Sequence, residues 1–173
     1  MKNLYYFLFT IAIITNIKMK IKEFDFEKQH QMEFNIFDFE LPHGKENLQN
    51  KINQWNSSEQ KAFLNEQLSL DYIFMSTLFP AILCLGFYVN DKITDIPTNK
   101  TIKSVIKTIA LLQLLAWLFD YCENIRLEKW ILSRQVGNDF LFKPMVYTKF
   151  GIAIVGIVLP ILLLLKINSK NKY

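Results

Sequence analysis

LDYIFMSTLFPAILCLGFYV, residues 70–89, decides the fold of this chain. Only Asp71, near its start, is charged, and a helix of about 20 mostly apolar residues crosses the roughly 30 Å of hydrocarbon in a bilayer. Three further apolar blocks occupy residues 4–17, 102–121 and 147–165. The sequence therefore predicts an all-α fold, a bundle of four transmembrane helices that forms a single integral membrane domain over residues 1–173.

The first apolar block, residues 4–17, is short enough to be the core of a signal peptide. Thr15-Asn16-Ile17 at its end offers no cleavage site with small residues, and three lysines follow at positions 18, 20 and 22. We therefore expect an uncleaved signal anchor that stays in the membrane as the first span.

The segment 18–69 is the longest part of the chain outside the four apolar blocks. Its first half alternates apolar and polar residues, from Met19 to Leu41, and the alternation changes phase near Phe37. Alternation with a period of two predicts two β-strands with a bulge at the phase change, which together would form a small hairpin. Pro42-His43-Gly44 would end the second strand.

A short helix is predicted after the hairpin. Leu48, Ile52 and Trp55 recur at spacings of three and four residues and form one narrow apolar stripe. Ser57 and Gln60 then have the spacing of a capping box, which marks the start of another helix. We expect that helix to run without a break into the second span.

The orientation in the membrane depends on how the basic residues are weighed. Total Lys and Arg counts favour placing 18–69 and the loop after the third span in the cytoplasm. Local density instead favours the N-terminus, the connection 90–107 and the acid-free C-terminal tail. Because long loops are translocated largely regardless of charge, we expect both termini on the cytoplasmic side of the cell's inner membrane.

The end of the third apolar block carries the candidate functional site. Asp120, Glu123 and Asn124 follow the spacing i, i+3, i+4, which places them on one helical face. Ionisable groups at the end of a span are costly unless they are paired, hydrated or bound to a ligand. Connectivity adds Asp71, because the second span begins on the membrane face where the third one ends.

The depth of these acids depends on where the third helix begins. A start near Ile102 puts Asp120 at the membrane interface, whereas a helix from Thr108 to Leu127 carries the acids inside the hydrocarbon boundary. We expect an intermediate position, with the acids just inside the interface.

Two interpretations of the acidic residues stay open. Their oxygen atoms would suit a hard cation or a polar ligand, and neighbouring carboxylates repel one another, which would favour proton uptake. Alternatively, the acids are hydrated helix ends or are paired with Arg126 or Arg134.

Other chemistry finds little support in the sequence. His30 and His43 lack the spacing of metal ligands, and Cys84 and Cys122 form no CxxC motif, so we expect neither a metal site nor a redox site. Phosphate-binding and nucleophile-elbow motifs are missing, so the sequence predicts no cofactor and no catalytic residues. Its lysines are scattered among acids, which argues against nucleic acid as a partner.

Several short motifs resemble those of a family of small bacterial four-span integral membrane proteins of unassigned function. The likeness covers roughly residues 37–125 and rests on FDFEL (37–41), Trp55, LDYIFM (70–75) and DYCENI (120–125). It implies a four-span fold and the same choice of acids, and it implies no activity. This chain departs from the pattern in its lysine-rich region before Phe37.

These observations predict a membrane binding or accessory protein with an acidic polar site between the second and third spans. The alternative is a small transporter, a proton- or cation-coupled carrier that uses the same acids. A membrane enzyme is less well supported, because no second catalytic element accompanies the carboxylates. The expected partners are the lipid bilayer and either another membrane protein or further copies of the chain in a homo-oligomer.

Overall fold

The computed structural model of the protein describes residues 1–31, 34, 39, 44–55, 57–94, 100–137 and 140–170. These residues form helices and no β-strand. The helices are α1 (Lys2–His30), α3 (Lys45–Gln54), α4 (Ser58–Thr94), α5 (Lys100–Ser133) and α6 (Phe142–Lys170). All but α3 are long and apolar enough to cross a membrane.

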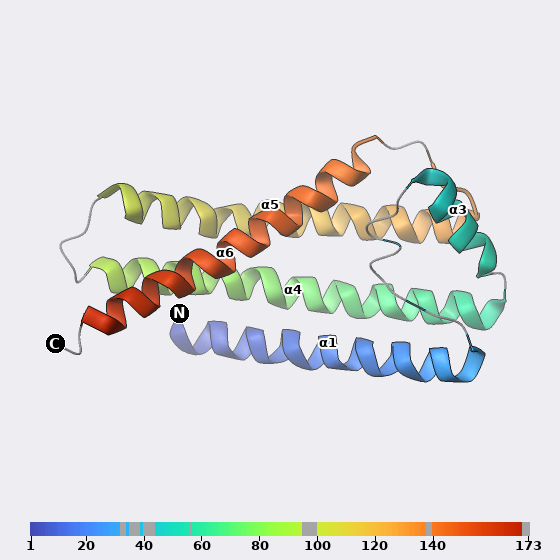
Figure 1. The fold of residues 1–173 in the computed structure, drawn as a ribbon, viewed down its shortest axis with the longest axis horizontal. Coiled ribbons are helices and arrows are strands. Elements are labelled where there is room, and N and C mark those ends of the chain that lie inside the picture. The colour runs from blue at the N-terminus through green and yellow to red at the C-terminus, as the bar shows by residue number, and fades with distance from the viewer. Residues whose placement is uncertain are drawn as a thin grey trace.

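The four long helices form an elongated bundle in which α4 is the central helix (Figure 1). It packs against α1, α5 and α6, and α6 also packs against α5. Figure 1 shows α6 crossing the α4 and α5 pair obliquely, so that both chain termini lie at one end of the bundle. The short helix α3 lies at the opposite end.

The predicted hairpin is wrong for its first strand, because α1 continues as helix to His30. No glycine or proline interrupts residues 18–30, and Met19, Glu23 and Phe26 are buried at spacings of four and three residues, the period of one helical face. The apparent alternation comes from exposed Ile21 and Phe24 on the other faces. Most of the second strand, with Pro42 and His43, lies outside the described residues.

The predicted helix start at Ser57 is confirmed. The backbone N–H of Gln60 donates to Ser57 Oγ at 3.1 Å, and the backbone N–H of Ser57 donates to Gln60 Oε1 at 3.2 Å. This reciprocal pair is a capping box, and α4 then runs unbroken through the second apolar block as expected. The preceding short helix, α3, is also present as predicted.

The third span is longer than either of the two expected versions. Helix α5 has 34 residues, about 51 Å at 1.5 Å per residue. It begins before Ile102 and continues beyond Leu127, so the acids at 120–124 lie in the interior of a continuous helix rather than at its end.

Three apolar clusters divide the bundle along its length. At the α3 end lies a large aromatic cluster, called the head cluster here, which includes Phe26, Phe34, Trp55, Leu64 and Trp130. Phe26 stacks on Phe63 and on Trp55, with ring centroids 4.1 and 4.9 Å apart. A middle cluster contains Met75, Phe79 and Ala116, and an end cluster near the termini contains Leu85, Val89, Ile93 and Ile106.

Helices α4 and α5 approach each other closely at Gly86. A Cβ atom built on Gly86 would lie 2.7 Å from the Cβ of Ala110 in α5. Small residues at such a crossing let two helices pack tightly, a common device in membrane bundles.

Candidate functional site

The four predicted site residues lie together between α4 and α5, and all are buried. The side-chain amide of Asn124 donates a hydrogen bond of 2.6 Å to Asp71 Oδ2, which joins the two helices directly. Asp120 and Glu123 lie on the same face of α5, as their spacing predicts. Connectivity was therefore sufficient to place Asp71 beside the trio, although what these residues bind stays a prediction.

The sequence analysis missed the counter-ion of these acids, which is Lys149 of α6. Its Nζ atom contacts Asp120 Oδ1 and lies 2.6 Å from Glu123 Oε2, and the lysine is buried with both carboxylates. Arg126 and Arg134, the partners considered from the sequence, lie elsewhere. Arg126 Nη1 is 3.1 Å from the sulfur of Met145, and Arg134 is exposed beyond the end of α5.

Lys149 could have been found by asking which charge compensates three acids at one level of the bundle. It is the only charged residue of the fourth apolar block. It occupies the third position of that block, however, where a lysine normally extends its ammonium group outwards to the headgroups. Sequence position alone therefore gives no sign that the side chain points inwards.

Glu23 of α1 is a second residue that the sequence analysis missed. It is only 5% exposed, and its Oε2 atom lies 2.5 Å from Lys20 Nζ one turn earlier. Its Oε1 atom is buried and has no hydrogen-bond partner among the described residues. The incorrect strand prediction hid this residue, because it obscured the helical face that Glu23 shares with Met19.

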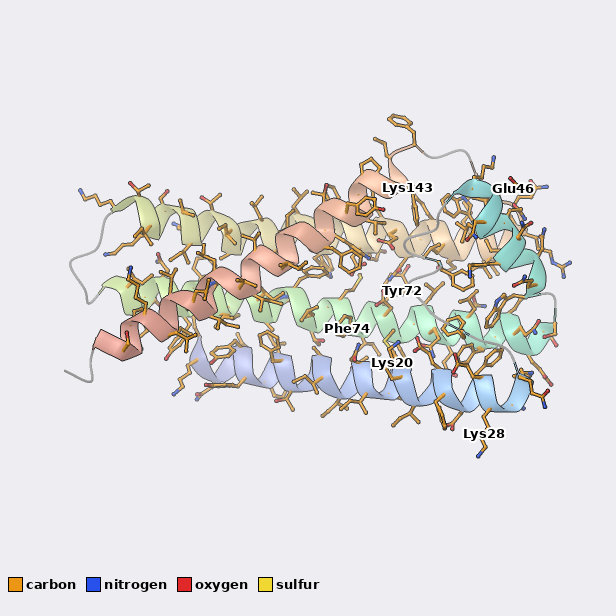
Figure 2. All side chains as sticks on the ribbon, viewed as in Figure 1. Lys20, Lys28, Glu46, Tyr72, Phe74 and Lys143 are labelled. Carbon is orange, nitrogen blue, oxygen red and sulfur yellow. The ribbon has the colours of Figure 1, made fainter. Side chains whose placement is uncertain are left out.

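A cavity of about 200 Å³ lies between Glu23 of α1 and the group formed by Asp71, Asp120 and Lys149. Every long helix contributes a charged residue to its wall, and the polar lining residues are Asn16, Lys20, Glu23, Asp71, Asp120 and Lys149. Apolar side chains form the rest of the wall: Met19, Phe74, Leu78, Phe79, Phe150 and Ala153. Figure 2 shows Lys20 of α1 and Phe74 of α4 in the space between these two helices.

The cavity and the residues behind it hold more carboxyl groups than ammonium groups. In their ionised forms, the carboxylates of Glu23, Asp71, Asp120 and Glu123 exceed the ammonium groups of Lys20 and Lys149 by two charges. Uncompensated charge is strongly disfavoured where the surroundings are apolar. A bound cation or protons would relieve this excess, so the arrangement is suited to take up positive charge.

Asp71, Asp120, Glu123, Asn124 and Lys149 form one polar layer across the bundle. Aromatic side chains mark the level of this polar layer along the bundle. The ring of Tyr72 lies 5.7 Å from that of Tyr121, which in turn stacks on Trp117 at 6.1 Å. Trp117 and Tyr121 are exposed, and the indole N–H of Trp117 is 3.4 Å from Ser76 Oγ. The polar layer thus lies between the head cluster and the middle cluster, at the level of a partly exposed aromatic group.

The remaining candidates take no part in this layer. The ring of His30 packs on Phe26 at 4.3 Å, while His43 lies outside the described residues. Within the described ranges, no group of three or more His, Cys, Asp or Glu side chains is placed to hold a metal ion. Cys84 and Cys122 are both free thiols.

Of the FDFEL motif, the structure describes only Phe39, which is buried in the head cluster and lies with its ring centroid 6.1 Å from that of Trp55. The chain matches no protein-family model, no curated protein and no solved structure in the comparisons made, so its resemblance to small four-span bacterial membrane proteins stays a prediction.

Proposed function

We propose that this chain is an integral membrane binding protein that holds a positively charged ligand in the cavity between α1, α4, α5 and α6. One observation carries the proposal: each of the four helices contributes a charged side chain to one largely apolar cavity. In their ionised forms these side chains, together with Glu123, which pairs with Lys149 behind the wall, have a negative net charge. A cavity with apolar walls and a few convergent charged groups is typical of small-molecule sites. Negative charge selects a cation.

The outward surface of the bundle supports a membrane location. Large apolar side chains are exposed along three of the long helices, among them Phe7, Ile13, Ile17, Leu114, Leu118, Ile154, Val158 and Leu162. Exposed apolar surface on this scale is costly in water and favourable in lipid. The lipid bilayer is the partner that this surface requires.

The charges at the end of the bundle that holds the termini support an orientation with both termini in the cytoplasm. Among the described residues at that end, Asp91 is the only acid, whereas the lysines there are Lys2, Lys92, Lys100, Lys103, Lys107, Lys166 and Lys170. Basic residues close to the ends of spans favour the cytoplasmic side and bind its anionic lipids. The head cluster and the cavity would then lie towards the outer leaflet.

The packed core between the cavity and the chain termini favours a binding protein over a carrier. Between the polar layer and the chain termini, the core is filled by the middle cluster and the end cluster. A carrier remains the second candidate because Lys149 forms ion pairs with Asp120 and Glu123. A cation could displace the ammonium group of this lysine from the two carboxylates and be displaced by it again. Flux of an alkylammonium ion into proteoliposomes would support the carrier and contradict the simple binding protein.

Binding can be tested with amphipathic ions of opposite charge. Octylammonium should raise the unfolding temperature of the detergent-purified protein in a saturable way, whereas octyl sulfate should not. At a concentration of 100 times its Kd, a ligand stabilises the folded state by about 2.7 kcal/mol. Asp71→Asn and Asp120→Asn should weaken the response to octylammonium.

Exposed Asp91→Asn, on the same helix as Asp71, is the matched control and should behave as the wild type. Equal responses to the two ions, or an undiminished octylammonium response in the Asp71 and Asp120 variants, would contradict a cation site in this cavity.

A further inference from the structure

We propose, on the basis of the binding function above, that the natural ligand is the headgroup of a phospholipid whose primary ammonium group enters the cavity while its phosphate stays near Lys20. Phosphatidylethanolamine has this chemistry. Four features carry the inference: the position of the cavity mouth, the acceptors inside, the lysine at its rim and the size of the space.

The cavity reaches the surface of the bundle beside α1, where two of its lining residues are exposed. Asn16 and Lys20 line the cavity and are exposed, and they alternate along one helical face with Ile13, Ile17 and Phe24. Each of these three apolar side chains is more than half exposed. A molecule lying in the membrane against this face would therefore reach the polar rim directly, with its acyl chains along the isoleucines.

The acceptors inside the cavity favour a primary ammonium group. Glu23 Oε1 is buried and unpartnered among the described residues, and Asp71 and Asp120 also line the wall. A primary ammonium group has three N–H donors, so it can satisfy several of these oxygens at once. A trimethylammonium group offers the same charge and no donor, and it would leave Glu23 Oε1 without a hydrogen bond.

The rim provides a site for the phosphate. The side chain of Lys20 is 52% exposed while its ammonium group contacts Glu23, so it can face a phosphate on its outer side. The polar layer also lies level with Trp117 and Tyr121, and exposed aromatic residues of this kind gather at the depth of lipid headgroups. The cavity is thus at the height where the ammonium and phosphate groups of a lipid are found.

The volume fits this ligand. One water-sized group needs about 10–15 Å³ of cavity, so about 200 Å³ holds roughly 13–20 non-hydrogen atoms. An ethanolamine phosphate group is smaller than this. The rings of Phe74, Phe79 and Phe150 would face its two methylene carbons, and aromatic faces also attract an ammonium group.

Native mass spectrometry and thermal unfolding of the detergent-purified full chain can test the inference with lipids that have identical acyl chains. Phosphatidylethanolamine should bind most tightly, phosphatidylcholine more weakly, and phosphatidylglycerol weakest, with roughly tenfold between the first and the last. Free ethanolamine phosphate should bind far more weakly than the lipid. If it binds as tightly as the lipid, the ligand is a soluble molecule and the lipid assignment is wrong.

Matched variants on α1 locate the binding. Glu23→Gln should lower affinity for phosphatidylethanolamine roughly tenfold, whereas the exposed Asp25→Asn should not change it. Lys20→Gln should weaken binding of the lipid and strengthen that of octylammonium, because it removes a positive charge from the cavity wall, with exposed Lys18→Gln as its control. Because Lys20 is at the surface, this second pair stays informative even if Glu23→Gln folds poorly.

Two failures can be told apart. If octylammonium binds through Asp71 and phosphatidylethanolamine binds no better than phosphatidylglycerol, the lipid assignment is overturned and the cation-binding function stands. If neither octylammonium nor phosphatidylethanolamine binds, both proposals are wrong.

Discussion

Lys149 and Glu123 form an ion pair across the interface between α6 and α5, with the ammonium nitrogen 2.6 Å from a carboxylate oxygen and side chains that are 4% and 0% exposed. The same lysine contacts Asp120. Burying a charge costs several kcal/mol unless a partner compensates it. These contacts therefore help to hold α6 in one position along α5.

Replacing the lysine should destabilise the protein strongly. Lys149→Met leaves two buried carboxylates without their counter-ion, and we expect a loss of about 3–5 kcal/mol in the free energy of unfolding. A thiol-reactive dye can follow unfolding in detergent, because Cys84 is buried in the folded state. Lys143→Met, an exposed change on the same helix, should have little effect.

The double variant Lys149→Met/Glu123→Gln distinguishes an ion pair from simple packing. It should be more stable than the sum of the two single changes predicts, because removing both charges leaves fewer unpaired groups. Strict additivity of the two losses would show that the two residues do not stabilise each other.

The hydrogen bond between Asn124 and Asp71 should contribute measurably to stability. Asn124→Leu removes the donor of this 2.6 Å contact and should cost about 1.5–3 kcal/mol, the range for hydrogen bonds to charged groups. Thermal unfolding can be compared with that of Asn65→Leu, a change at an exposed asparagine of α4. A loss no larger than that of Asn65→Leu would mean that Asp71 is held by other contacts.

Gly86 should be intolerant of even a methyl group. Gly86→Ala places a Cβ atom 2.7 Å from that of Ala110, so α4 and α5 must move apart, at a cost of about 1–3 kcal/mol. Gly151→Ala is the matched control, because nothing lies within 4 Å of its added Cβ atom. That change should be neutral or stabilise α6 by up to about 1 kcal/mol through helix propensity. Similar unfolding temperatures for the two variants would rule out a tight crossing at Gly86.

Membrane orientation can be read from single cysteines. In a background with Cys84→Ala and Cys122→Ala, Ser58→Cys should react with a membrane-impermeant maleimide in intact cells, while Ser104→Cys should react only after the cells are opened. Both serines are exposed, and they lie towards opposite ends of the bundle. The reverse pattern of labelling would place the termini and the basic end outside the cell.

Sequence reasoning succeeded where hydrophobicity or spacing dominates. The apolar run 70–89 dictates α4, and Ser57 with Gln60 marks its start through a local capping interaction. Asp71 could be placed beside Asp120 because two successive antiparallel helices return to the same end of the bundle. These inferences need only local geometry and connectivity, which a single sequence contains.

It failed where a residue's role depends on a distant partner. The residues after Lys18 have a pattern that fits both a strand and a helix, and packing of Met19 and Phe26 against the rest of the bundle decides for helix. Lys149 looks like a surface lysine until α6 is seen to cross α5. Glu23 joins the cavity only because α1 is helical at that point, so the error in secondary structure concealed part of the site.

The ion pair between α5 and α6 also has a consequence for how the protein is made. Asp120 precedes Lys149 by 29 positions, so at about 5–20 residues per second the ribosome adds the lysine roughly 1.5–6 s later. The acids of the third helix therefore emerge from the ribosome before the lysine that compensates them. For the membrane location proposed above, stable insertion of the third helix should then depend on the arrival of the fourth, and a nascent chain that stops before Lys149 should be retained by the insertion machinery or degraded.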